Sequence, residues 1–279
     1  MPIWKSLVSR PDAILALVLL TAVVLAGLCA PVVFPDGPWR MVARPFIPPF
    51  TDMRHPLGAD ALGRDLAASL MYGARTSLEI GLVSTCVAIL FGAGVGGIAG
   101  FFGGRVDSIL MRSTEMFQTV PSFALAILLV AIYAPSLTSI MVAIAVVSWP
   151  PVARLARAEF LSMRRREFVQ AALLSGQSNL RVAWSQILPN TLSPLIVMAA
   201  LMVSMAILFE SALSFVGLGD PQVVSWGYLI SAGRGVMARS WWLTFLPGMA
   251  IMLTIVSISI LGDAIGDSQD PHFERKEDL

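Results

Sequence analysis

Charged residues are scarce in this chain of 279 amino acids. Only 13% are Asp, Glu, Lys or Arg, whereas 56% are hydrophobic, and the mean hydropathy is +0.77. Soluble domains carry about 25% charged residues, so the composition excludes an ordinary soluble protein and indicates an integral membrane protein. The net charge of +1 gives no sign of a nucleic-acid partner.

Lysine, histidine and cysteine each occur only twice, which limits the chemistry of the chain. Neither Lys5 nor Lys276 follows the glycine-rich spacing of a phosphate-binding loop. The two histidines stand far apart, so no metal site is predicted. Cys29 and Cys86 both lie in apolar runs, which favours packing residues over a disulfide. We therefore expect no cofactor in this chain, and any ATP must be bound by another chain.

Six segments are apolar enough to be membrane-spanning helices of about 20 residues. They cover residues 13–34, 78–102, 109–134, 137–149, 190–218 and 241–261. Pro150 and Pro151 are expected to interrupt the fourth. The first resembles a signal peptide in its basic start, but Pro31 and Phe34 make a poor cleavage site, so a retained anchor is favoured.

The distribution of basic residues predicts the orientation of these spans. With a cytoplasmic N-terminus, the inner segments hold twelve of the nineteen lysines and arginines, and six of those lie between Arg154 and Arg181. Both termini are then cytoplasmic. The predicted division is an anchor (1–34), a periplasmic loop (35–77), a five-helix core (78–263) and a tail (264–279). The periplasmic loop includes a short helix near residues 61–73. The core includes an inner loop at about 151–190 and another short outer helix near residues 225–237.

Glycines recur every fourth residue at Gly92, Gly96, Gly100 and Gly104. On a helix these positions share one face. They suit either a ligand path beside bare backbone or close helix packing. Packing is the favoured interpretation.

Polar residues inside the predicted spans are candidates for a translocation path: Glu115 and Gln118 in the third span and Glu210 in the fifth. Glu115 also has Arg112 three positions before it, which favours a local ion pair. Glu210 has no basic residue within a turn, which leaves a path role or a hydrogen bond to another helix. The spans contain neither histidine nor lysine and no two deep aspartates, which argues against an intramembrane hydrolase.

Residues 167–190, EFVQAALLSGQSNLRVAWSQILPN, interrupt the apolar pattern after three arginines. EFVQAALLSG predicts a short helix that ends at Gly176. Such a helix suits either docking of a partner protein or simple attachment of the loop to the membrane surface. The residue pattern alone leaves both open.

The motifs of this stretch resemble those of a known family. QAALLSG (170–176) followed by ILPN (187–190) is similar to the cytoplasmic signature of permease subunits in bacterial ABC importers. That signature is Glu-Ala-Ala, three residues and Gly, then a spacer that ends in Leu-Pro. Gln170 stands where the family has Glu, so the charge is missing there.

Four further segments look like the dipeptide, oligopeptide and nickel importers, and specifically like the second of their two permease subunits. They are residues 55–81, 214–219, 225–234 and 245–271, in the family's order. The resemblance implies a type I importer permease fold with six transmembrane helices in the bacterial inner membrane. It implies as partners a second, homologous permease, two ATPases that bind ATP, and a substrate-binding protein outside. The implied ATPase-coupling residues are Glu167, Phe168, Gln170, Ala171, Ala172, Leu173 and Gly176.

Other classes of function remain as alternatives. An autonomous secondary carrier or channel is the main one, and it would normally show internal repeats of spans, of which no convincing example is present. Dependence of transport on an ATPase separates it from an importer subunit. The identity of the substrate does not follow from the sequence.

Overall fold

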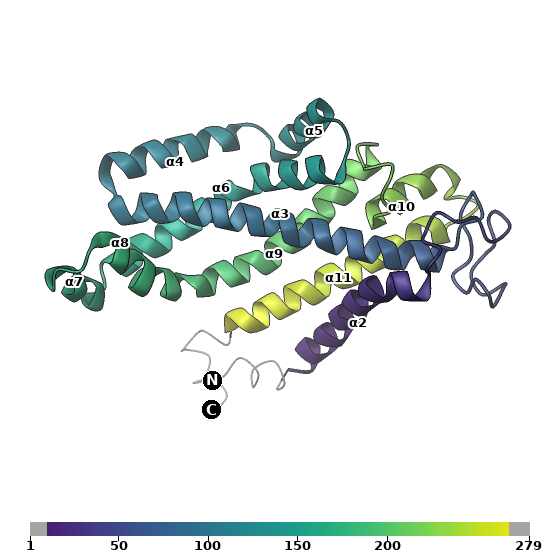
Figure 1. The fold of residues 1–279 in the computed structure, drawn as a ribbon, viewed down its shortest axis with the longest axis horizontal. Helices are drawn as coiled ribbons and strands as arrows, with labels where there is room; N and C mark the ends of the chain where they lie inside the picture. The colour runs from purple at the N-terminus through teal and green to yellow at the C-terminus, as the bar shows by residue number, and fades with distance from the viewer. Residues whose placement is uncertain (1–9, 268–279) are drawn as a thin grey trace.

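The computed structural model describes residues 10–267, so Lys5, Lys276 and the greater part of the predicted tail lie outside the described residues. Within this range the fold is helical and has no strand beyond two isolated β-bridges. Long helices run side by side in an elongated bundle, with the short helix α7 at one end and α10 towards the other (Figure 1). The elements are α2 (Pro11–Val33), α3 (Leu66–Phe102), α4 (Gly104–Thr119), α5 (Ser122–Tyr133), α6 (Leu137–Arg164), α7 (Glu167–Leu174), α8 (Asn179–Val182), the π-helix η1 (Ala183–Ile187), α9 (Leu188–Phe215), α10 (Trp226–Gly233), the 3-10 helix η2 (Arg234–Val236) and α11 (Trp242–Asp267).

Five helical stretches in the described part are long and apolar enough to cross a membrane, and α4 with α5 makes a sixth if the bent pair is one span. One of the five is a continuous helix of 37 residues, Asn179–Phe215, formed by α8, η1 and α9. Arg10 Nη1 donates to Asp267 Oδ2 at 2.6 Å, which joins the start of α2 to the end of α11. The hydrogen bonds that Arg10 donates to Asp12 and Asp267 raise its pKa above the ordinary value.

The second span begins earlier than the sequence predicts, because Asp65 caps it. Asp65 Oδ1 accepts from the backbone N–H groups of Ala67 (2.7 Å) and Ala68 (3.4 Å), two of the donors that a helix start leaves unpaired. From Leu66 the helix then runs unbroken for 37 residues. The predicted short helix near residues 61–73 is therefore not separate, and the loop predicted to be periplasmic ends at Asp65 rather than at residue 77.

The third predicted span is not one straight helix. The axes of α4 and α5 differ by 82°. Pro121 lies at the break, and Val120 before it is extended, with φ −89° and ψ 131°. Proline disfavours a helical conformation in the residue that precedes it, so α4 ends there.

Pro150 and Pro151 have no such effect, and the expectation that they interrupt the fourth span was wrong. Helix α6 continues through both prolines to Arg164. A proline inside a spanning helix is tolerated where neighbouring helices support the backbone. Helix α3 provides that support, because α6 packs closely along it.

The glycine repeat is a helix-packing surface, as favoured from the sequence. A Cβ at Gly96 would lie 2.1 Å from the carbonyl oxygen of Ala153, and one at Gly92 would lie 2.6 Å from that of Trp149. The backbones of α3 and α6 therefore approach more closely than any side chain allows. Gly104 does not share this surface, because it begins α4 in a positive-φ conformation (φ +55°) with open space at its Cβ position.

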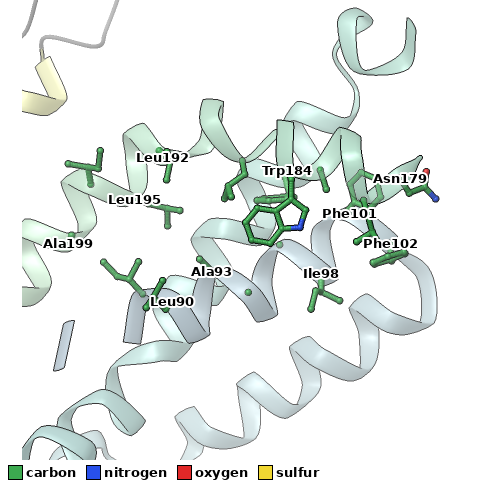
Figure 2. A pocket seen from close by; sticks show the side chains of 18 residues that line it. Leu90, Ala93, Ile98, Phe101, Phe102, Asn179, Trp184, Leu192, Leu195 and Ala199 are labelled. Atoms are coloured by element: carbon green, nitrogen blue, oxygen red, sulfur yellow. The ribbon is translucent and has the colours of Figure 1, made fainter. Parts of the chain in front are cut away.

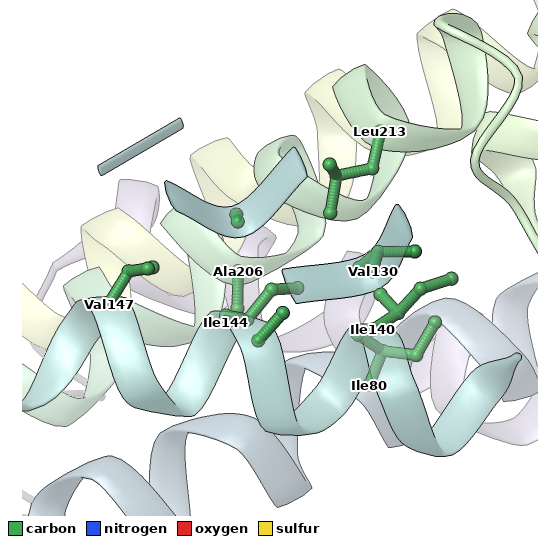
Figure 3. Close-up of a cluster of buried hydrophobic side chains, with 9 residues drawn as sticks. Ile80, Val130, Ile140, Ile144, Val147, Ala206 and Leu213 are labelled. Carbon is green, nitrogen blue, oxygen red and sulfur yellow. The ribbon is translucent and has the colours of Figure 1, made fainter. Parts of the chain in front are cut away.

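A buried apolar cluster fixes the bent helix α5 to the rest of the bundle. Ile80 of α3, Val130 of α5 and Ile140 of α6 each have at most 1% of their surface exposed. Ala206 and Leu213 of α9 complete the contact, and the side chains of all four helices converge in Figure 3.

Candidate functional site

The short helix α7 has one buried face and one exposed face. Val169 and Ala172 are 0% and 7% exposed, and they pack in a cluster with Phe101, Phe160 and Ile187. The cluster ties α7 to the ends of α3, α6 and α8–α9. It holds the helix in one position against the bundle.

The rest of the surface of α7 leaves two apolar side chains exposed. Leu174 is 88% exposed and Phe168 is 47% exposed. Glu167, Gln170 and Ala171 are exposed beside them. An apolar patch rimmed by polar residues is typical of a protein interaction site.

The residues predicted as ATPase-coupling thus divide between the two faces. Glu167, Phe168, Gln170 and Ala171 are on the exposed face, whereas Ala172 points into the chain's own core and Leu173 is half-buried. The resemblance implies that Ala171 and Ala172 are both coupling residues, but in the structure only Ala171 is exposed. The side chain of Gln170 donates from Nε2 to the carbonyl oxygen of Arg164 at 2.8 Å.

Gly176 ends α7 as the sequence predicts. Its φ of +81° places it in the left-handed region that favours glycine. The N–H of Gly176 donates to the carbonyl oxygen of Leu173 at 3.0 Å, and the N–H of Gln177 donates to the carbonyl oxygen of Ala172 at 3.2 Å. This pair of bonds is a Schellman motif. The turn directs the chain into Ser178, whose hydroxyl accepts from the N–H of Arg181 at the start of α8.

Glu210 is buried in the protein, with 1% of its surface exposed. Its Oε1 accepts hydrogen bonds from Ser214 Oγ at 2.7 Å and from Ser225 Oγ at 2.6 Å. Its Oε2 has no hydrogen-bond partner among the described residues. Of the two interpretations given above, the hydrogen bond to another helix is present, since Ser225 is the N-cap residue of α10. A role in the translocation path stays a prediction.

The two polar candidates of the third predicted span belong to α4, whereas Glu210 belongs to α9. Glu115 is exposed and Gln118 is half-buried. No ion pair joins Arg112 to Glu115 within residues 10–267, contrary to expectation. A different acid of α4, Asp107, forms an ion pair. Arg157 of α6 donates from Nη2 to Oδ2 of Asp107 at 2.6 Å. Sequence reasoning missed this pair because the two residues are fifty positions apart.

An apolar groove of about 510 Å³ lies between α3 and the α8–α9 helix, beside the exposed Trp184. Figure 2 shows side chains from both helices turned towards this groove. Its labelled lining residues are Leu90, Ala93, Ile98, Phe101, Phe102, Asn179, Trp184, Leu192, Leu195 and Ala199.

Metal-ligating side chains do not gather anywhere in residues 10–267, where no group of three or more His, Cys, Asp or Glu is arranged to hold an ion. His55 Nδ1 instead lies 2.7 Å from Oδ2 of the capping residue Asp65. Cys29 and Cys86 are free thiols, and both are exposed rather than packed inside.

Comparison with known proteins gives consistent matches along the chain. Residues 92–275 match the family described as binding-protein-dependent transport system inner membrane component. A di/tripeptide transport system permease protein of Pseudomonas aeruginosa is 38% identical over 275 residues, which cover 96% of this chain and 90% of the relative. A dipeptide transport system permease protein of Bacillus subtilis is 35% identical (98% and 85% covered). An oligopeptide transport system permease protein of Haemophilus influenzae is 34% identical (93% and 84% covered).

Proposed function

The chain belongs to the family of binding-protein-dependent transport system inner membrane components, and from this premise we propose that it forms half of the membrane path of an importer for peptides. It is a multi-pass permease subunit of an ABC transporter. The peptide substrate is inferred from relatives named as di/tripeptide, dipeptide and oligopeptide permeases, each matched over more than four-fifths of its length.

The exposed face of α7 is the observation that carries the proposal. A helix fixed to three others through Val169 and Ala172, with Leu174 and Phe168 left uncovered, suits the transfer of movement from a docked protein into the bundle. We assign Glu167, Phe168, Gln170, Ala171 and Leu173 to the contact with an ATPase subunit, together with Leu174. Ala172 and Gly176 position the helix rather than touch the ATPase.

The proposed topology has six spans, with α4 and α5 together forming the third. Both termini and α7 are cytoplasmic, while residues 35–65 and α10 face the periplasm. The bond between Arg10 and Asp267 supports termini on one side, and the arginines around α7 support its cytoplasmic position. The five-helix core then starts at α3, and the bacterial inner membrane is the proposed location.

The proposed partners are a second permease of the same family, two ATPase subunits and a substrate-binding protein. The chain itself has no catalytic role in this proposal and holds no cofactor, because ATP is bound and hydrolysed by the ATPase subunits. Glu115 and Gln118 remain proposed path residues.

Reconstitution of the whole complex in proteoliposomes tests the proposal. Uptake of a labelled dipeptide should require this chain, the ATPases, ATP and the binding protein. Uptake at an unchanged rate without the ATPases would identify an autonomous carrier instead. No uptake of di-, tri- or oligopeptides by an active complex would refute the substrate class.

A further inference from the structure

The carboxylate of Glu210 connects the long helix α9 to the short helix α10. Glu210 belongs to α9, the long helix that begins near α7, and its bonding partner Ser225 caps the short outer helix α10. The contact is shielded, because Glu210 is 1% exposed and Ser225 is 4% exposed. Hydrogen bonds to an ionisable group are stronger away from water than at the surface.

The first turn of α10 is arranged around this carboxylate. Ser225 Oγ donates to Glu210 and accepts from the N–H of Tyr228 at 3.0 Å, while the N–H of Trp226 donates to Ser77 Oγ on α3 at 3.2 Å. Gly227 lies directly against Glu210, since a Cβ there would be 3.0 Å from both carboxylate oxygens and 2.6 Å from Ser211 Cα. No residue larger than glycine fits between α10 and α9 at this point.

The opposite end of α10 is also bound to α9. Arg234 follows α10 directly, and its Nη1 donates to the carbonyl oxygen of Phe215 at 2.6 Å. Phe215 is the last residue of α9, where unpaired carbonyls and the helix dipole attract a cation. The guanidinium also lies 5.2 Å from the centre of the Phe215 ring. Helix α10 is thus attached to α9 at both of its ends.

We propose that α9 and α10 move as one rigid body, with Glu210 as the positioning residue that holds α10 in place and so carries movement from α7 to the outer face. This inference rests on the proposed function, because it needs an ATPase at α7. The continuous helix Asn179–Phe215 supports it, since it links the turn after α7 to the Glu210 contact without a break. In Figure 1, α7 and α10 lie at opposite ends of this helix.

The attachment itself is testable in the purified full chain without partners. Leu229 of α10 is 7% exposed, so a Leu229→Cys variant in which Cys29 and Cys86 are replaced should react slowly with an aqueous maleimide. Adding Glu210→Ala should raise the labelling rate about fivefold, because a typical intramolecular hydrogen bond shifts an equilibrium by roughly that factor. An unchanged rate would overturn the proposal whatever the chain transports.

The transfer of movement is tested in the reconstituted complex as the ratio of ATP hydrolysis with and without loaded binding protein. Gly227→Ala and Ser214→Ala should reduce this ratio and leave complex yield and basal hydrolysis unchanged. The controls are Gly235→Ala, at a glycine with nothing within 4 Å of its Cβ position, and Ser204→Ala, at a buried serine of α9 that bonds only to its own helix. Both controls should keep the full ratio.

The possible outcomes separate the inference from the proposed function. Full stimulation in Gly227→Ala and Ser214→Ala complexes would overturn the inference and leave the peptide importer intact. A parallel fall in yield, basal rate and stimulated rate would also overturn it, because the contact would then only stabilise the fold. A wild-type complex without peptide transport would contradict the proposed function, and the Leu229→Cys labelling would still decide whether Glu210 holds α10.

Discussion

Asp107 of α4 and Arg157 of α6 bind each other through two parallel hydrogen bonds, Nη2 to Oδ2 at 2.6 Å and Nε to Oδ1. The pair fixes the amphipathic helix α4 to a span that continues to the segment before α7. Bidentate pairs of this kind restrict orientation as well as distance. Arg157 is 36% exposed and Asp107 is 16% exposed, so solvent screens part of their attraction.

Removal of this pair should destabilise the chain modestly. Arg157→Gln should cost about 1 kcal/mol after allowance for screening, which corresponds to a fall of roughly 2–4 °C in the unfolding midpoint of the detergent-purified chain. Arg154→Gln is the matched control, because Arg154 lies on the same helix and is exposed without a bonded acid in the described residues. Equal midpoints for the two variants would show that the Asp107 contact contributes nothing.

The close contact of α3 with α6 predicts a larger effect from a single methyl group. Gly96→Ala should lower stability by about 1–3 kcal/mol, because its Cβ would overlap the carbonyl of Ala153. Gly94→Ala, two positions away with open space at its Cβ position, should be neutral or slightly stabilising. Thermal unfolding followed by helix content measures both. A neutral Gly96→Ala would mean that the two backbones are farther apart than described.

The proposed orientation predicts which sites react from outside the cell. In a chain without Cys29 and Cys86, Met53→Cys should be labelled by an impermeant reagent in intact spheroplasts, and Ser178→Cys should react only after lysis. Both positions are exposed in the structure, Met53 by 91%, so burial does not explain a difference. Labelling of Ser178→Cys from outside would contradict the six-span topology.

Conformational strain at Gly176 should uncouple the complex without unfolding the chain. Gly176→Val forces a branched residue into positive φ, which costs on the order of 1–3 kcal/mol, and should shift α7 and reduce ATPase stimulation. Gly37→Val applies the same strain in the loop between α2 and α3, at φ +77° and also in open space. It should keep normal stimulation. An equal loss in both variants would indicate general destabilisation rather than a role for α7.

The sequence predicted those elements whose signals are local. The apolar runs of α2 and α11, the short helix at α10 and the turn at Gly176 all depend on residues within a few positions of one another. Proline shows where local reasoning fails. Pro121 ends a helix, whereas Pro150 and Pro151 do not, because the bare glycine face of α3 supports α6 beside them.

The partners that Glu210 and Ala172 have on other helices could not be predicted from neighbouring residues in the sequence. Glu210 obtains its hydrogen bond from Ser225 on another helix, and Ala172 faces inward because Phe101 and Phe160 occupy that side. Small size at Ala172 is compatible with either a partner's groove or the chain's own core. Only the packing of α7 on the bundle decides between them.

Docking of an ATPase on α7 is the central claim, and the exposed Leu174 gives its most direct test. Leu174→Asp places a charge on the exposed side of α7, where the leucine side chain is 88% exposed. The fold of the chain itself should therefore not change. Leu62→Asp is the control, at a leucine of the loop between α2 and α3 that is 49% exposed. Co-purification of the ATPase subunits with the tagged chain should be lost in Leu174→Asp and kept in Leu62→Asp. Full recovery of the ATPases with Leu174→Asp would contradict the assignment of α7 as the docking helix.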